Sequence, residues 1–113
     1  VFCHPASIDS IPTSTDKEDH VSMGVTAGLK LWKVLENVKA CLAIEILCNT
    51  QALEFQRPHK STPALESVHN LVRETVPPIE EDRVFYNDIQ NILNLVEKNN
   101  IITAVENNIG ELK

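Results

Sequence analysis

The sequence predicts an all-α protein, and three observations carry that prediction. Aromatic residues make up only 4% of the 113 residues, and there are only three glycines. The alternating apolar pattern of strands and the Asn-Gly or Asp-Gly turns of β-hairpins are absent from the sequence. Apolar residues instead recur at spacings of three, four and seven, which places them on one face of a helix. The hydrophobic fraction of 42% is too high for a disordered chain.

The first expected helix covers about residues 24–55 and is the longest. Its apolar face is formed by Leu31, Leu35, Val38, Leu42, Ile46 and Leu53. Asp19 or Ser22 can cap its start, and Pro58 ends it. At 1.5 Å per residue such a helix is roughly 48 Å long, whereas a compact chain of this size is only about 34 Å across. The helix therefore does not fit inside its own chain.

Residues 40–48 of this helix, ACLAIEILC, are apolar on nearly every side. A helix with that pattern is enclosed by other elements, and the rest of this chain is too short to surround it. We therefore expect partner subunits, or the remainder of a larger protein, to cover it. The alternative is a helix that breaks near Asn37 or Asn49 and folds back. Glu45 either pairs with a cation from another chain or faces solvent along a narrow seam.

Three shorter helices are expected after the first, over about residues 62–74, 86–97 and 103–108. Thr62 is a good N-cap, and Pro63 suits the first helical position. Pro77 and Pro78 form a break after the second helix, and an acidic connector follows. The Asn-Asn dipeptide at positions 99–100 ends the third helix.

Composition and charge exclude several classes of protein. Ten basic and sixteen acidic residues give a net charge of −6, which argues against binding to nucleic acid or to an anionic membrane. The sequence has neither an uncharged apolar run of about 20 residues, as a membrane span needs, nor a signal-peptide pattern. Cys41 and Cys48 lie in the apolar helix and are expected to be small buried side chains. We therefore expect a reducing, cytoplasmic setting.

A polar cluster, Glu18, Asp19 and His20, stands just before the first helix. Two adjacent carboxylates held in one loop suit proton transfer or the binding of a cationic ring. The alternative from spacing alone is a solvated acidic cap, because a carboxylate at a helix N-terminus is favourable by itself.

The other polar candidates are weaker. Cys3 is followed by His4, but neighbours on an extended chain point apart, so a thiol nucleophile is not expected there. His59 and His69 have no cysteine or acid at ligand spacing and are expected to be ordinary surface residues. The sequence therefore predicts no metal site.

Several stretches of this sequence resemble the histidine ammonia-lyases, within the aromatic amino-acid ammonia-lyase family. The matching stretches are CHPASIDSIPTSTDKEDHVSMG (residues 3–24), LAIEILCNTQALEFQRP (residues 42–58), STPALESV, VRETVP and EEDR. The resemblance covers about residues 2–89 and implies an all-α part of a larger helical-bundle lyase. It implies an active-site loop over residues 1–23, a long core helix over 24–57 and shorter helices over 58–113.

Histidine ammonia-lyases eliminate ammonia from L-histidine to give urocanate. The resemblance implies that Glu18 is a catalytic carboxylate that also contacts the substrate, and that Ser14 is a substrate-binding residue nearby. Phenylalanine and tyrosine lyases usually carry Gln at the matching place, so an acid here favours histidine, whose ring can hold a positive charge. The resemblance also implies a tetramer whose active sites are shared between subunits. The expected partners are therefore the remainder of the lyase, further copies of it, and an amino-acid substrate.

Two departures from the family pattern are important. Lys17 stands where Gln is usual and places a cation beside Glu18, which can weaken proton acceptance. The family's electrophile, a methylidene-imidazolone, is made from an internal Ala-Ser-Gly, and the nearest sequence here is Ala6-Ser7-Ile8. The chain alone is therefore expected to be inactive. Two alternatives stay open: a non-catalytic interaction or oligomerisation module derived from the lyase fold, and an aromatic amino-acid ammonia-lyase or aminomutase.

Overall fold

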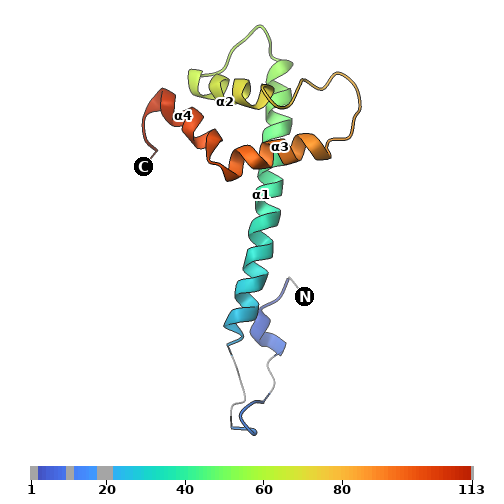
Figure 1. The fold of residues 1–113 in the computed structure, drawn as a ribbon, viewed down its shortest axis with the longest axis vertical. Helices are drawn as coiled ribbons and strands as arrows, with labels where there is room; N and C mark the ends of the chain where they lie inside the picture. Colours follow the sequence, from blue (N-terminus) through green and yellow to red (C-terminus); the bar gives the residue numbers. More distant parts are fainter. Residues whose placement is uncertain (1–2, 10–11, 18–21, 113) are drawn as a thin grey trace. The chain divides into compact units, whose positions relative to one another are not determined.

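The computed structural model describes residues 3–9, 12–17 and 22–112 of the chain, and the described residues form four α-helices and no strand. A short 3₁₀ helix, η1, comes first, and the remaining elements follow in the order drawn in Figure 1. Their bounds are η1 Ala6–Asp9, α1 Gly24–Glu54, α2 Pro63–Arg73, α3 Tyr86–Glu97 and α4 Asn100–Ile109. The prediction of an all-α fold is confirmed.

The chain divides into two compact units, residues 1–38 and residues 39–113, with the boundary inside α1. In the first unit the Lys30 ammonium donates a hydrogen bond to the carbonyl of His4, which ties the N-terminal segment to the helix. Lys33 and Glu36 form an ion pair of 2.9 Å one turn apart on the exposed helix surface. Apolar side chains of this unit, such as Trp32, are largely exposed.

The hydrophobic core lies in the second unit. It is formed by Ala43 and Leu47 of α1, Val72 of α2, Val76 just after α2, and Ile92 and Leu95 of α3. Helices α2 and α4 pack against each other, and α3 contacts α4 through a tight corner. Figure 1 shows α2 and α3 lying against the C-terminal part of α1. The strongly apolar faces of these short helices therefore converge on one side of α1.

Helix boundaries follow the sequence signals closely. The Thr62 hydroxyl accepts a hydrogen bond of 3.4 Å from the Leu65 N–H, and Pro63 is the first residue of α2. Helix α1 is continuous from Gly24 to Glu54, so the alternative of a helix that breaks and folds back is wrong.

The last helix is longer than expected. Asn99, two residues after the end of α3, has the left-handed conformation, with φ of 57°, and α4 starts at the next residue, Asn100. Asparagine tolerates this backbone better than most residues. One left-handed residue is therefore enough to turn the chain from α3 into α4.

The apolar stretch at residues 40–48 is covered on one side only. Ala43 and Leu47 are buried, whereas Leu42 and Ile44 each keep 44% of their surface exposed. The prediction that Cys41 and Cys48 are buried is wrong for this chain, because the short helices cover only part of the surface of α1 and leave both thiols exposed. Glu45 is exposed as well. Among the described residues, no helix is long and apolar enough to cross a membrane.

Candidate functional site

The loop before α1 contains an unusual left-handed turn. Ser14, Thr15 and Asp16 have φ angles of 53°, 57° and 61°, and none of them is glycine. The Lys17 N–H closes the turn with a hydrogen bond of 3.2 Å to the Thr13 carbonyl. A left-handed L-residue costs about 1–2 kcal/mol, and such strain is concentrated at functional sites in proteins. The strained turn is therefore a candidate functional feature, and the polar cluster of Glu18, Asp19 and His20 directly follows it in the sequence.

The predicted catalytic residue follows this turn. Glu18, Asp19 and His20 lie outside the described residues, so their roles stay predictions. Ser14 and Lys17 are described and are both exposed; Ser14 is the first left-handed residue of the turn, and Lys17 directly follows its last. Ser14, the predicted substrate-binding residue, therefore lies in the same short loop as Lys17, which directly precedes Glu18 in the sequence.

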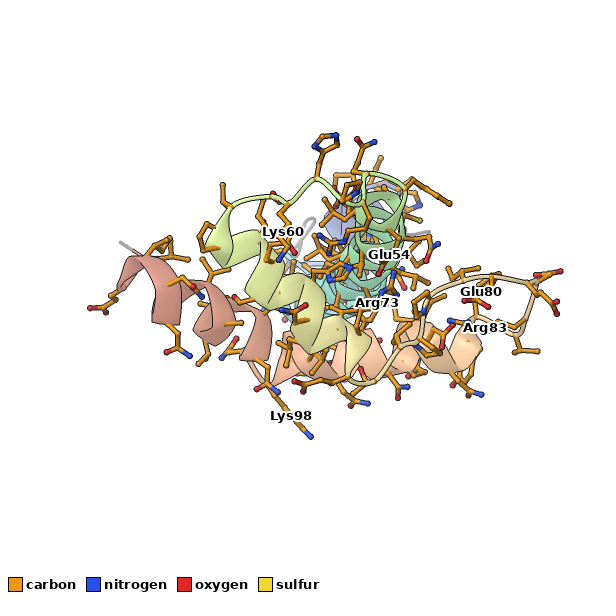
Figure 2. The ribbon with its side chains drawn as sticks, turned by 90° about the horizontal axis from the view of Figure 1, so that it is seen from above. Glu54, Lys60, Arg73, Glu80, Arg83 and Lys98 are labelled. Carbon is orange, nitrogen blue, oxygen red and sulfur yellow. The ribbon has the colours of Figure 1, made fainter. Side chains whose placement is uncertain are left out.

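Sequence reasoning missed a second polar constellation, where α1 ends beside α2. Glu54 Oε1 accepts a hydrogen bond of 2.8 Å from Arg73 Nε and lies 2.8 Å from His69 Nε2. Arg57 donates through Nη1 to both carboxylate oxygens of Glu66, at 3.0 and 2.9 Å. Figure 2 shows the labelled Glu54 and Arg73 side chains on neighbouring elements. These contacts hold the loop between α1 and α2 against α2.

His69 is the central residue of this constellation, and the prediction that it is an ordinary surface residue is wrong. Only 6% of its surface is exposed. His69 lies three residues before Val72 on α2, and both are buried. That spacing on one helical face was the signal available in the sequence. His59, in contrast, is exposed, as expected.

Hydrogen bonds shift the acidity of both carboxyl groups in the network. The Arg73 guanidinium bonded to Glu54 is the main cause that lowers the pKa of that carboxyl below 4.5, with His69 adding to the effect. The Ser61 backbone N–H, 2.8 Å from Glu66 Oε1, is the main cause that lowers the pKa of Glu66, with Arg57 beside it. Both groups are therefore more acidic in the folded chain than in an unfolded one.

This difference predicts acid-sensitive stability for the second unit. A carboxyl group whose folded pKa is depressed stabilises the fold above its unfolded pKa of 4.5, and that contribution disappears as the pH falls through the folded pKa. We expect the urea midpoint of unfolding to fall between pH 5 and pH 3. The double variant Glu54→Gln, Glu66→Gln should show a flatter acid limb. An equally steep limb in that variant would contradict this assignment.

A set of side-chain to backbone hydrogen bonds fixes the segment after α2. Gln51 accepts from the Ile79 N–H at 2.9 Å and donates to the Ile79 carbonyl at 3.2 Å. Arg73 donates to the carbonyls of Val76 and Pro77, at 3.2 and 3.4 Å. Arg83 donates to the Pro77 carbonyl at 2.8 Å. This proline-rich segment is therefore held rigidly against the end of α1.

An open apolar groove of about 460 Å³ lies between this segment, α3 and α1. It is lined by Ile44, Leu47, Cys48, Gln51, Ala52, Phe55, Ile79, Phe85 and Ile89. Phe55 keeps 78% of its surface exposed at its edge. Within the described ranges no cluster of three or more His, Cys, Asp or Glu residues is arranged to hold a metal ion.

The fold and the polar loop define this chain as an all-α segment in which a left-handed turn leads to a long helix with an uncovered apolar face. The family model described as aromatic amino acid lyase matches residues 1–74, which is 74 of the 113 residues. The chain belongs to the aromatic amino acid lyase family.

Comparison with individual proteins agrees with that assignment. The chain is 47% identical over its full length to histidine ammonia-lyase from Symbiobacterium thermophilum, covering 22% of that protein. It is 47% identical to histidine ammonia-lyase from Caenorhabditis elegans, over 93% of the chain and 16% of the relative. The chain spans about a fifth of the length of the curated relatives it matches.

Two solved structures share the fold. The crystal structure of histidine ammonia-lyase from Trypanosoma cruzi superimposes with a TM-score of 0.85 and 46% identity, over 93% of this chain and 21% of that one. The structure of tyrosine aminomutase from Streptomyces globisporus gives a TM-score of 0.82 and 30% identity, over 91% of this chain and 20% of that one. The same helical arrangement therefore occurs in lyases and in an aminomutase.

Proposed function

We propose that this chain is the C-terminal part of a histidine ammonia-lyase, a carbon–nitrogen lyase that eliminates ammonia from L-histidine to give urocanate. The observation that carries the proposal is the acid at position 18, within a KEDH sequence that directly follows the left-handed turn. The chain is 47% identical to two histidine ammonia-lyases but only 30% identical to the tyrosine aminomutase, and this difference supports histidine as the substrate.

The chemistry of the carboxylate explains this preference for histidine. A carboxylate can accept a proton from an imidazole ring or balance the charge of an imidazolium, whereas a glutamine amide can do neither. Glu18 therefore acts both as a substrate-binding residue and as a catalytic group. Ser14, exposed in the preceding turn, supplies a hydroxyl for the substrate. Lys17 beside the carboxylate favours its charged form, which suits an ion pair with an imidazolium.

The methylidene-imidazolone of the family does not come from the residues of this chain. The sequence contains no Ala-Ser-Gly, and the branched side chain of Ile8 stands where the cyclising glycine would be. Another part of the lyase supplies that electrophile. This chain by itself is inactive under the proposal.

The partners in this proposal are the remainder of the lyase and further copies that form a tetramer. The exposed apolar residues of α1 and the groove beside Phe55 support such partners, because apolar patches of this kind usually mark interaction surfaces. We place the enzyme in the cytoplasm, which fits the three free cysteines.

A graft tests the proposed activity. In this graft, the chain is inserted in place of the matching segment of the Symbiobacterium thermophilum enzyme, which aligns with it over all 113 residues. We expect the graft to convert histidine to urocanate, followed by the absorbance of the product. A soluble, folded graft that assembles like the parent enzyme but forms no urocanate would contradict the proposal. That outcome would favour the alternative of a non-catalytic oligomerisation module, for which the unusual Lys17 is the best argument.

A further inference from the structure

The N-terminal part of α1 presents an exposed apolar stripe, formed by Val25, Leu29 and Trp32. These residues are spaced four and three positions apart, so they lie on one face of the helix. They keep 82%, 70% and 68% of their surface exposed. Residues 24–38 form a helical stretch of only about 15 residues in the first unit, a length that is marginally stable in water without packing. This Trp32 stripe therefore needs a cover.

The apolar groove of the second unit has the form that receives such a stripe. One of its walls is preformed, because the Gln51 side chain bonds both the N–H and the carbonyl of Ile79. Phe55 stands exposed at its edge. Apolar grooves bind amphipathic helices through anchors spaced three, four and seven residues apart, and the Trp32 stripe has this spacing.

Four acidic side chains stand at the edge of the groove. Glu45 lies three residues before Cys48 on α1 and shares its helical face. Residues 80–82, Glu-Glu-Asp, directly follow Ile79 in the sequence. All four acids are exposed, and within the described ranges none of them forms an ion pair. The groove therefore favours a partner that is apolar in the middle and basic at its flanks.

The Trp32 stripe has flanks of the matching sign. Lys30 and Lys33 each directly follow a member of the stripe in the sequence. Lys30 donates to a neutral backbone carbonyl, whereas Lys33 pairs with Glu36. Residues 24–38 thus carry two lysines and one glutamate, a net charge of +1. This charge is opposite in sign to that of the acids around the groove.

We propose that the Trp32 stripe of one copy of the chain docks into the apolar groove of a second copy. The proposal rests on the proposed function, because it names a contact for the further copies that the lyase requires. Each copy brings both a stripe and a groove, so a closed assembly of identical copies covers both surfaces. Trp32 and Phe55 are the main anchors, since aromatic side chains dominate the binding energy of interfaces.

Two complementary variants of the full chain test the docking. The groove variant Ala52→Glu, Phe55→Ala keeps the stripe, and the stripe variant Leu29→Ala, Trp32→Ala keeps the groove. All four positions are exposed, so both variants should retain the circular dichroism of the unchanged chain. In sedimentation, the mixture should associate at least about 10-fold more tightly than either variant alone, because only the mixture contains an intact stripe and an intact groove.

Fluorescence gives a second readout of the same mixture. Trp32 is the only tryptophan of the chain, so in the mixture all the emission comes from the groove variant. Adding the stripe variant should shift this emission to shorter wavelength as the indole leaves water. Ile109→Ala in the stripe variant is the control, because Ile109 is exposed on α4 and does not line the groove. It should leave the shift unchanged.

Three results would overturn the docking. A groove variant that associates with itself as tightly as the unchanged chain would mean that stripes pair with stripes. A stripe variant that does so would mean that grooves pair with grooves. An unchanged chain that stays monomeric would assign the groove to another part of the lyase. Urocanate formation by the graft is read separately, so an active graft whose variants fail to associate would remove the docking and leave the lyase assignment in place.

Discussion

Replacing Glu18 by Gln in the graft should lower kcat/KM for histidine by about 10²- to 10⁴-fold, the usual contribution of a positioned acid or base. The amide keeps the size of the side chain but can neither accept a proton nor pair with an imidazolium. If the carboxylate acts in the chemical step, kcat should fall as well as kcat/KM. Urocanate absorbance over a range of histidine concentrations gives both constants.

Asp16→Asn is the matched control for that substitution. Asp16 is exposed in the same loop, and its φ of 61° is a conformation that asparagine adopts readily. This change removes the carboxylate two positions before Glu18 in the sequence without disturbing the left-handed turn, so activity should stay near that of the unchanged graft. Equal losses in the two variants would mean that the loop needs only its negative charge, and that Glu18 has no particular role.

Ile92→Ala should lower the free energy of unfolding of the second unit by about 2–5 kcal/mol, the usual effect of removing a core isoleucine side chain. Ile92 has no exposed surface and is among the largest fully buried side chains described. It lies in the core with Val72 of α2 and Leu47 of α1, so the cavity would open between three helices. Urea titration followed by circular dichroism measures this loss.

Ile102→Ala makes the same chemical change on an exposed part of α4. Ile102 keeps 47% of its surface exposed, so its truncation should alter the free energy of unfolding by no more than about 0.5 kcal/mol. The core assignment would be wrong if the two variants lost similar amounts of stability.

The helices could be predicted because their signals are local. Apolar residues at helical spacing predicted the third helix over residues 86–97, which is where α3 lies. Thr62 and Pro63 marked the start of α2 in the same way. Local spacing did not reveal that Asn100 begins α4, because an Asn-Asn dipeptide breaks a helix equally well whether or not another follows at once.

The network around His69 could not be predicted from spacing. Glu54, His69 and Arg73 are separated by up to 19 positions, and only the path of the loop between α1 and α2 brings them together. The exposure of Cys41 and Cys48 was missed for a related reason. An apolar helix is enclosed only if neighbours cover every face, and within this chain the short helices cover one.

The candidate site rests on two kinds of evidence. The proposed role of Glu18 comes from the resemblance of residues 3–24 to histidine ammonia-lyases, and no periodicity or spacing in the sequence leads to it alone. The left-handed backbone of Ser14, Thr15 and Asp16 came from the structure, because none of these residues is the glycine that usually signals such a turn. Both observations direct attention to the same short loop.

The most direct test of the account is the ratio of kcat/KM for histidine to kcat/KM for tyrosine in the graft. Because a carboxylate at position 18 can form an ion pair with an imidazolium ring, whereas a phenol carries no positive charge, we expect histidine to be preferred by at least about 100-fold. A graft that turns over tyrosine as well as it turns over histidine would contradict the claim that this loop binds an imidazole ring.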